Sequence, residues 1–234
     1  MEAFEGLWEK FSLSVQEGNA VDLVETLDHP KSYLAAKFLT HRTLNVEVVA
    51  RTFTPLWRTD HGFSIRDTND NKLVFVFEDE ADRERVMLGE PWAYDKYLVV
   101  LQRIEEEEAI DEVDFGKTSF WVQLHGLPVR RMNPEVATIL GSSLGKVDQI
   151  SAGDALAEGG QAMWIRVCLD ITKPLCRGRL TRFEKGREVW ISFKYERLPN
   201  FCYWCRQITH SDKDCAYWLR NKDTLRVEDQ QFGP

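Results

Sequence analysis

The chain has 234 residues, enough for one large domain or two small ones, and its eight tryptophans and thirteen phenylalanines exclude a mostly disordered protein. No apolar run approaches the roughly 18 residues of a membrane span, so no membrane partner is expected. The net charge of −8 is uneven, because residues 161–234 carry a net of +5 and residues 1–160 a net of −13, so a nucleic-acid contact is expected in the C-terminal part.

Residues 1–30 are predicted to form a short helix over 4–17 followed by a polar segment. The start, MEAFEGLWEK, carries glutamates where a secretory signal carries basic residues and an apolar stretch. We therefore expect an intracellular protein, in the nucleus or the cytoplasm. Cysteines in that environment stay reduced, so a tight cysteine cluster favours metal binding or catalysis over disulfides.

Residues 31–104 are predicted to form a β-α-β-β-α-β domain, the split unit of ferredoxin-like folds. Strands are expected at 33–40, 63–67, 72–79 and 96–104, with a helix after Asn45 and a second after Asp79, each of which is a preferred N-cap residue. Phe75 and Phe77 are two residues apart and share one sheet face. That face is either an RNA-stacking platform or the core, and the acidic charge of this half favours the core.

Residues 105–116 are acidic and are interpreted as a solvated linker. A second, smaller α+β unit is predicted over 117–199. It contains a strand at 120–128, a helix from Pro134 to Leu144, a short strand near Ile150, a loop at 157–161, a strand at 162–171 and a hairpin turning at 184–186. A zinc knuckle is predicted over 200–217, and a polar tail over 218–234.

Four metal-binding side chains stand within fourteen residues, in the pattern C-x2-C-x4-H-x4-C formed by Cys202, Cys205, His210 and Cys215. Soft sulfur and borderline imidazole donors at this spacing suit tetrahedral Zn²⁺, which is the predicted cofactor. Four protein ligands leave no open position, so the site is expected to be structural. Cys168 and Cys176 are interpreted as ordinary cysteines of the preceding strand and turn.

Zinc knuckles of this spacing commonly bind unpaired bases. Tyr203 and Trp204 stand between the first two ligands, where their rings either stack on a base or pack against the hairpin. The cations expected to meet phosphate are Arg206 and Lys213 in the knuckle and Arg177, Arg179, Arg182 and Arg197 before it.

Several stretches of the sequence resemble a plant protein family found in the first reading frame of LINE-type retrotransposons and in derived genomic copies. They are KFLTHRTLNVEVVARTFTPLWR (37–58), RVMLGEPWAYDKYLVVLQR (85–103), FWVQLHGLP (120–128) and FKYERLPNFCYWC (193–205). The resemblance spans residues 31–215. It implies a domain of unknown function related to RNA-recognition-motif folds, then a zinc knuckle with the four ligands above, and binding of zinc and nucleic acid.

The knuckle departs from the family at two positions. The family usually has glycine directly after the second cysteine and directly before the histidine, where this chain has Arg206 and Thr209. Because glycine adopts positive φ without cost, these replacements are expected to strain the knuckle or weaken its contact with nucleic acid. The family's sequence is also expected to continue beyond the final QQFGP.

Two enzyme motifs are rejected on their context. GKT at 116–118 lacks the first glycine and the preceding strand of a phosphate loop. GSSLG at 141–145 places Ser143 at the end of a helix, whereas a nucleophile elbow stands between a strand and a helix. The sequence therefore predicts a non-catalytic protein that takes no small-molecule substrate and binds single-stranded RNA or DNA. The alternative is a protein-interaction or self-association module in which the zinc site only fastens the C-terminal part.

Overall fold

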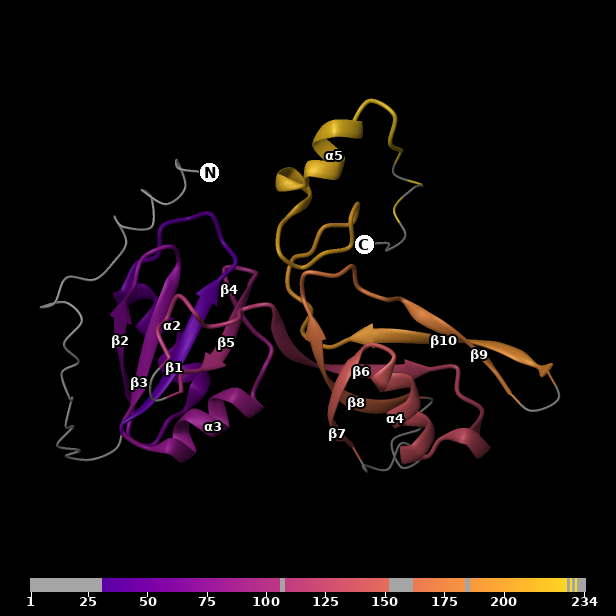
Figure 1. Ribbon diagram of the computed structural model, residues 1–234, viewed down its shortest axis with the longest axis horizontal. Coiled ribbons are helices and arrows are strands. Elements are labelled where there is room, and N and C mark those ends of the chain that lie inside the picture. Colours follow the sequence, from indigo (N-terminus) through magenta and orange to yellow (C-terminus); the bar gives the residue numbers. More distant parts are fainter. Residues whose placement is uncertain are drawn as a thin grey trace, which may run out of the picture. The chain divides into compact units, whose positions relative to one another are not determined.

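Figure 1 shows the computed structural model of the chain, which describes residues 31–105, 108–151, 162–183, 186–226, 228 and 230. All of them belong to one of the chain's two compact units, Lys31–Pro234. The helix expected over 4–17 and the loop expected over 157–161 lie outside these residues. Every helix in the described part of the chain is too short or too polar to cross a bilayer.

The first domain is a five-stranded antiparallel sheet with two helices. Its elements are β1 (Ser32–Phe38), α2 (Val46–Trp57), β2 (Phe63–Asp67), β3 (Lys72–Phe77), α3 (Glu80–Leu88), β4 (Trp92–Tyr94) and β5 (Tyr97–Arg103). The strand order is β2-β3-β1-β5-β4. Apart from the extra edge strand β4, this is the predicted β-α-β-β-α-β arrangement, so the predicted fold class is confirmed.

Both helices of this domain begin at the cap residues that the sequence indicates. The Asn45 side chain accepts the backbone N–H groups of Glu47 and Val48 at 2.9 and 3.2 Å. Asp79 accepts the N–H of Ala81 at 3.1 Å. These bonds satisfy N–H groups that have no partner inside the helix, so each helix starts at a defined position relative to the sheet.

Phe75 and Phe77 lie in the core between the first sheet and its helices. Both are 0% exposed. The rings of Phe53 and Trp57, from α2, lie 6.3 and 4.7 Å from that of Phe75. The core interpretation of these two phenylalanines is therefore confirmed, and neither ring is accessible for stacking on a base.

The opposite face of the first sheet is also a packing surface. Leu98 and Val100 of β5 are fully buried and belong to the core of the second domain. On the neighbouring strands, Ala35 and Val76 are 0 and 2% exposed. Tyr33, the aromatic residue of β1 on this face, has its ring 5.9 Å from the guanidinium of Arg66. This face therefore lacks the open aromatic platform of an RNA-recognition sheet.

The second domain repeats the strand order of the first. Its elements are β6 (Lys117–His125), the 3₁₀ turn η2 (Val129–Arg131), α4 (Pro134–Ser142), β7 (Gly145–Ile150), β8 (Ala162–Asp170), β9 (Gly178–Arg182) and β10 (Glu188–Tyr195). The order β7-β8-β6-β10-β9 matches β2-β3-β1-β5-β4 strand for strand. In the described residues, no helix stands between β8 and β9, where α3 stands between β3 and β4.

Helix α4 covers the second sheet. It is capped, as predicted, by Asn133, whose side chain accepts the N–H of Val136 at 2.9 Å. The helix lies so close to β7 and β8 that a Cβ on Gly141 would be 2.7 Å from Val147 and 2.9 Å from Ile165. A glycine at this point of the helix is what allows the close approach.

The C-terminal end of α3 is held by two arginines from the second half of the chain. Arg166 of β8 donates to the carbonyl oxygen of Leu88. Arg197, which follows β10, donates to those of Gly89 and Glu90 at 2.7 and 2.8 Å. Carbonyl groups at a helix C-terminus lack partners within the helix and carry partial negative charge, so guanidinium groups stabilise this contact between the domains.

The carboxyl group of Glu90 is buried at the same contact. Glu90 is 4% exposed, and the hydroxyl of Thr118 donates to it at 3.1 Å. Burial raises the pKa of Glu90 to about 7, although Thr118 and Arg166 favour the charged form. This carboxyl therefore titrates near neutral pH, well above its ordinary value of 4.5.

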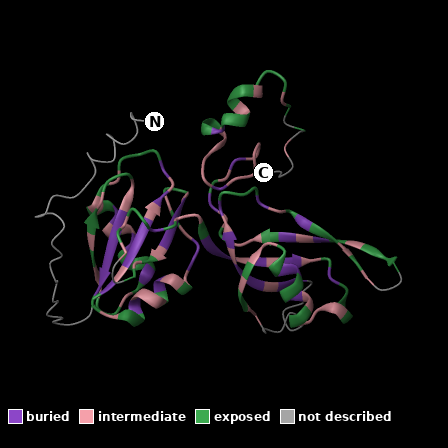
Figure 2. Ribbon diagram, viewed as in Figure 1, coloured by how far each residue is buried: buried purple, intermediate pink, exposed green. Residues whose placement is uncertain are grey.

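One strand and one α-helix were not predicted. The edge strand β4 has three residues and pairs with β5. Beyond Cys215, where a polar tail was expected, the chain forms helix α5 (Ala216–Asn221). Figure 2 shows that most of α5 is exposed, in contrast to the inner strands of both sheets, of which β1, β3 and β8 are mostly buried.

Candidate metal centre

The four ligands predicted from the sequence come together in the structure. One ligand atom from each of Cys202, Cys205, His210 and Cys215 lies within 4.8 Å of the others. Sγ of Cys205 and Nε2 of His210 are 3.2 Å apart. Ligands at about 2.3 Å from a tetrahedral ion are roughly 3.8 Å from one another, so this donor set fits Zn²⁺.

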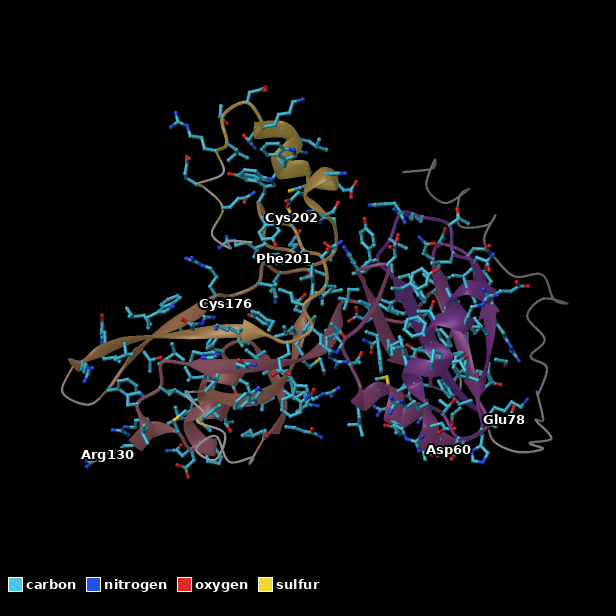
Figure 3. All side chains as sticks on the ribbon, turned by 180° about the vertical axis from the view of Figure 1, so that it is seen from behind. Asp60, Glu78, Arg130, Cys176, Phe201 and Cys202 are labelled. Carbon is cyan, nitrogen blue, oxygen red and sulfur yellow. The ribbon has the colours of Figure 1, made fainter. Side chains whose placement is uncertain are left out.

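The other two cysteines, Cys168 and Cys176, stay outside this cluster, as expected. Figure 3 labels Cys176 on the segment that precedes β9, and Cys202 on the segment that leaves the second sheet for α5. Cys176 donates its thiol hydrogen to the carbonyl of Gly178 at 3.2 Å. Among the five cysteines, the cluster therefore contains only the three of the C-x2-C-x4-H-x4-C pattern.

A tight backbone turn aims the first two cysteines at the same point. The N–H of Arg206 donates to the carbonyl of Cys202 at 2.7 Å, and the N–H of Cys202 donates to that of Gln207 at 2.9 Å. Arg206 has φ of 67°, in the left-handed region. This conformation costs a non-glycine residue about 1–2 kcal/mol, which gives a backbone cause for the strain expected where the family has glycine.

Thr209, the other position where the family has glycine, is not among the described residues with positive φ. Its hydroxyl instead lies 3.1 Å from Nδ1 of His210. A proton on Nδ1 donated to this hydroxyl leaves the lone pair on Nε2, the nitrogen that faces Cys205. The sequence reasoning missed this contact because it treated Thr209 only as a lost glycine.

Two of the three cysteines in the cluster are buried, since Cys202 and Cys215 are exposed by 0 and 1%, whereas Cys205 is partly exposed. Burial raises the pKa of Cys202 and of Cys205. At Cys215 burial acts in the same direction, but the backbone N–H of Trp218 and the neighbouring thiols bring its pKa below the ordinary value. A divalent cation would deprotonate such a group of thiols.

The knuckle is fastened to the second domain by its turn. The N–H of Leu175 donates to the carbonyl of Arg206 at 2.8 Å, and the side chain of Gln207 donates to the carbonyl of Thr172. Ile208 is 2% exposed and packs in the second core. The metal centre is therefore held on the loop between β8 and β9.

The aromatic residues between the first two ligands have different surroundings. Trp204 stacks on Trp218 of α5, with ring centroids 4.5 Å apart and planes at 13°. Tyr203 lies beside Phe201, with centroids 4.6 Å apart, and its N–H donates to Asp212 at 2.7 Å. Trp204 thus packs on a helix that was not predicted, and both rings stay partly exposed.

Most of the predicted phosphate-binding cations have partners within the chain. Arg179 donates to the carbonyl of Ser143 at 3.0 Å, and Arg182 pairs with Glu188 at 2.7 Å. Arg197 holds the end of α3, and Arg177 and Arg206 also take part in interactions within the chain. Lys213 is exposed and has no salt bridge among the described residues. Contact of these residues with nucleic acid stays a prediction.

A second cluster of potential ligands, His61, Asp79 and Asp82, has a structural role. Asp82 is fully buried and accepts the N–H groups of Asp60 and His61, each at 2.9 Å. Arg85 also donates to it at 3.0 Å. Its oxygens are therefore already used in holding the loop before β2.

Ser143 occupies the C-cap of α4, as the sequence reasoning expected, and its hydroxyl donates to the carbonyl of Leu140 at 2.6 Å. Lys117 and Thr118 of the GKT sequence begin strand β6. Neither motif has the strand-to-helix context of its enzyme family.

Comparison with known proteins gives two family matches, which cover different parts of the chain. Residues 28–112 match the family described as "Domain of unknown function (DUF4283)", and residues 169–217 match the family described as "Zinc knuckle". The two matches follow each other along the chain in this order. Cys202, Cys205, His210 and Cys215 all lie within the zinc-knuckle match.

Two further similarities were found. The chain is 29% identical over 132 residues to an uncharacterized protein of Arabidopsis thaliana, and the match covers 56% of this chain but only 41% of that relative. A solved structure titled "Sxl-lethal protein/RNA complex" aligns with 70% of this chain and 99% of its own, at 14% identity and a TM-score of 0.28. The fold assignment therefore rests on the strand orders described above.

Proposed function

We propose that this chain is a non-catalytic nucleic-acid-binding protein whose zinc knuckle takes part in binding single-stranded RNA. The observation that carries the proposal is the convergence of four metal ligands in a segment that matches the zinc-knuckle family. Cys202, Cys205, His210 and Cys215 would hold the Zn²⁺. Such an ion contributes the free energy that folds a short segment, roughly 10–16 kcal/mol in zinc-finger peptides.

The absence of catalysis is part of the proposal. Three thiolates and one imidazole would complete the tetrahedral shell of the ion, so no position would stay open for a substrate or a reactive water. The serine of the GSSLG sequence is engaged as a helix cap. Both observations support a binding role.

The charge distribution supports a nucleic-acid partner. Residues 161–234, which include the zinc knuckle, carry a net charge of +5, whereas the rest of the chain carries −13. Phosphate groups would therefore be attracted to the C-terminal part, whereas the acidic charge that would repel them belongs to residues 1–30 and 105–116, with net charges of −6 and −7. An origin in the first reading frame of a LINE-type retrotransposon is supported by the sequence resemblance and by the order of the two matched modules.

Self-association is a second candidate function, favoured by one observation. Trp190 and Leu180 are directly opposite each other on β10 and β9, and are 49 and 61% exposed. Because β9 is the edge strand of the second sheet, this apolar pair lies where a second copy would add its own strand. Sedimentation of the full chain at several concentrations tests this candidate.

Binding of a fluorescent single-stranded RNA by the full chain tests the proposed function. We expect zinc-dependent affinity that falls steeply as salt rises. Cys202→Ser should lose both tightly bound zinc and the zinc-dependent affinity, whereas Cys168→Ser, a cysteine outside the cluster, should keep both. A wild-type protein that is loaded with zinc and does not bind RNA at low salt would contradict the proposal.

A further inference from the structure

A groove of about 720 Å³ opens between the knuckle and the turn that joins β4 to β5. The first domain contributes Lys96 and Tyr97, the knuckle contributes Tyr203 and Lys213, and the connecting segment contributes Asn200 and Phe201. This volume is within the range of about 300–1,000 Å³ that is typical of ligand sites.

Hydrogen bonds hold the two walls of the groove together. The N–H of Asn200, directly before the knuckle, donates to the carbonyl of Lys96 at 2.8 Å. Arg197 binds the carbonyls of Gly89 and Glu90 and lies 5.7 Å from the ring of Trp92 in β4. The knuckle and the β4–β5 turn are therefore fixed to each other through the segment between them.

The groove presents aromatic rings and cations together. Tyr97, Phe201 and Tyr203 are all partly exposed. Lys96 and Lys213 are exposed, and neither has a salt bridge in the part of the chain that the structure describes. Of the lining residues, Asp212 alone is acidic, and one of its oxygens accepts the N–H of Tyr203.

This combination matches the chemistry of an unpaired nucleic-acid strand. Aromatic rings stack on exposed bases, while lysines attract the phosphates that connect them. In a duplex the base faces are already stacked on each other and do not reach such rings. A simple anion would use the lysines but not the three aromatic rings.

We propose that this groove is the path of the single strand, and that Lys96 and Tyr97 of the first domain form part of the nucleic-acid site together with Tyr203 and Lys213. The inference rests on the proposed function and extends it to a module without an assigned role. The first domain thus contributes through its β4–β5 turn and not through a face of its sheet.

The test measures binding of a fluorescent 12-nucleotide single-stranded RNA to the full zinc-loaded chain. Tyr97→Leu should weaken binding about ten-fold or more, because stacking on one base is lost. Lys96→Ala should reduce the slope of log affinity against log salt by about 0.7, the contribution of one phosphate contact on a single strand. Neither variant should change the zinc content, since neither residue is a ligand and both substitutions keep the backbone hydrogen bond between Lys96 and Asn200.

Matched controls are Tyr33→Leu and Lys146→Ala. Tyr33 is also a partly buried tyrosine on a strand of the first sheet, and Lys146 is an exposed lysine on β7 that does not line the groove. Both should bind like the wild type. If Tyr97→Leu does not fold, Lys96→Ala still tests the inference, because the Lys96 side chain is exposed and its removal should not disturb folding.

The outcomes separate this inference from the proposed function. If the wild type binds in a zinc-dependent way but Lys96→Ala and a folded Tyr97→Leu bind with unchanged affinity and salt slope, the groove is not the site and the inference is overturned. A wild type that does not bind at all would overturn the proposed function as well. Equal affinity of the wild type for a 12-base-pair duplex and for the single strand would also contradict the inference, because the bases of a duplex do not reach the rings.

Discussion

The hydroxyl of Thr209 is the residue-scale contact that most directly supports a metal-binding histidine. It lies 3.1 Å from Nδ1 of His210, on the side of the ring opposite to the nitrogen that faces Cys205. Partners of this kind fix the orientation of a ligand, and their loss typically weakens metal affinity by about 10–100-fold. We therefore expect Thr209→Val to bind zinc about ten-fold or more weakly, as measured by competition with a chromophoric chelator.

The control for this substitution is Thr138→Val on α4, where the hydroxyl only bonds the carbonyl of Pro134. It should leave zinc affinity unchanged. Thr209→Ser keeps the hydroxyl and should restore most of the affinity. Equal zinc affinity of Thr209→Val and the wild type would show that the hydroxyl does not orient the ring.

Glu90 gives the chain a pH-dependent stability with a defined sign. Burial raises its pKa from 4.5 to about 7. The folded protein therefore binds this proton more tightly than the unfolded chain does, so the contribution is present below pH 4.5 and is lost as the pH rises to about 7. Glu90→Gln lacks this titration, and its stability relative to wild type should rise by up to about 3 kcal/mol between pH 4.5 and 8.

Denaturant unfolding of the two proteins at several pH values measures this difference. Glu84→Gln is the control, because hydrogen bonding to Arg103 lowers the pKa of Glu84, so it titrates below this window. Its difference from the wild type should be constant from pH 5 to 8. A constant difference for Glu90→Gln as well would mean that Glu90 is not shifted upward.

The individual ligands could be predicted from the sequence, whereas their partners could not. The spacing of Cys202, Cys205, His210 and Cys215 is local, and it is sufficient to indicate a shared ion. The contact of Trp204 with Trp218 depends on a helix fourteen residues away, and Trp218 stood in a segment without a recognisable pattern. Contacts that form only when distant parts of the chain fold together cannot be predicted from the spacing of residues in the sequence.

At the scale of elements, helix α5 is coupled to the metal centre. Its N-cap is the ligand Cys215, whose sulfur accepts the N–H of Trp218 at 3.5 Å, and Trp218 stacks on Trp204. We expect Trp218→Ala to reduce the free energy of local opening of α5 by about 1 kcal/mol, the contribution of an aromatic pair, as measured by amide hydrogen exchange.

Tyr217→Ala provides a comparison within the same helix, since Tyr217 is 49% exposed. It should change α5 protection much less than Trp218→Ala. If the two substitutions had the same effect, the stacked indoles would not be what holds the helix to the knuckle.

The elements that were predicted are those with strong local signals. Helices α2, α3 and α4 start at Asn45, Asp79 and Asn133, all of which cap through their side chains. Of the two edge strands β4 and β9, only β9 was predicted, because a hairpin turn follows it in the sequence. The three residues of β4 form no recognisable pattern. Helix α5 was missed because it has six residues and a cysteine in place of a usual cap.

For the whole molecule, the structure predicts an uneven response to loss of metal. Each sheet has its own buried core, which requires no ion. The knuckle has few buried apolar residues apart from Ile208, so its folding depends on the metal. A chelator should remove amide protection from residues 202–219 while protection of β1, β3 and β5 stays unchanged. Loss of protection across the first sheet would contradict this independence.

Packing on both of its faces explains why the first sheet offers no open aromatic platform for RNA bases among the described residues. One face packs on α2 and α3, and the other contributes Leu98 and Val100 to the core of the second domain. This closure could not be predicted from the sequence, because it depends on contacts between the two domains. It leaves the turn between β4 and β5 as the part of the first domain that borders the groove.

The most direct test of the central claim is photo-crosslinking of a single-stranded RNA that contains 4-thiouridine to the zinc-loaded full chain, with the crosslinked residues identified by mass spectrometry. The account predicts crosslinks at Tyr97, Phe201 and Tyr203, which disappear when zinc is removed. Crosslinks confined to other surfaces, or unchanged after removal of zinc, would contradict it.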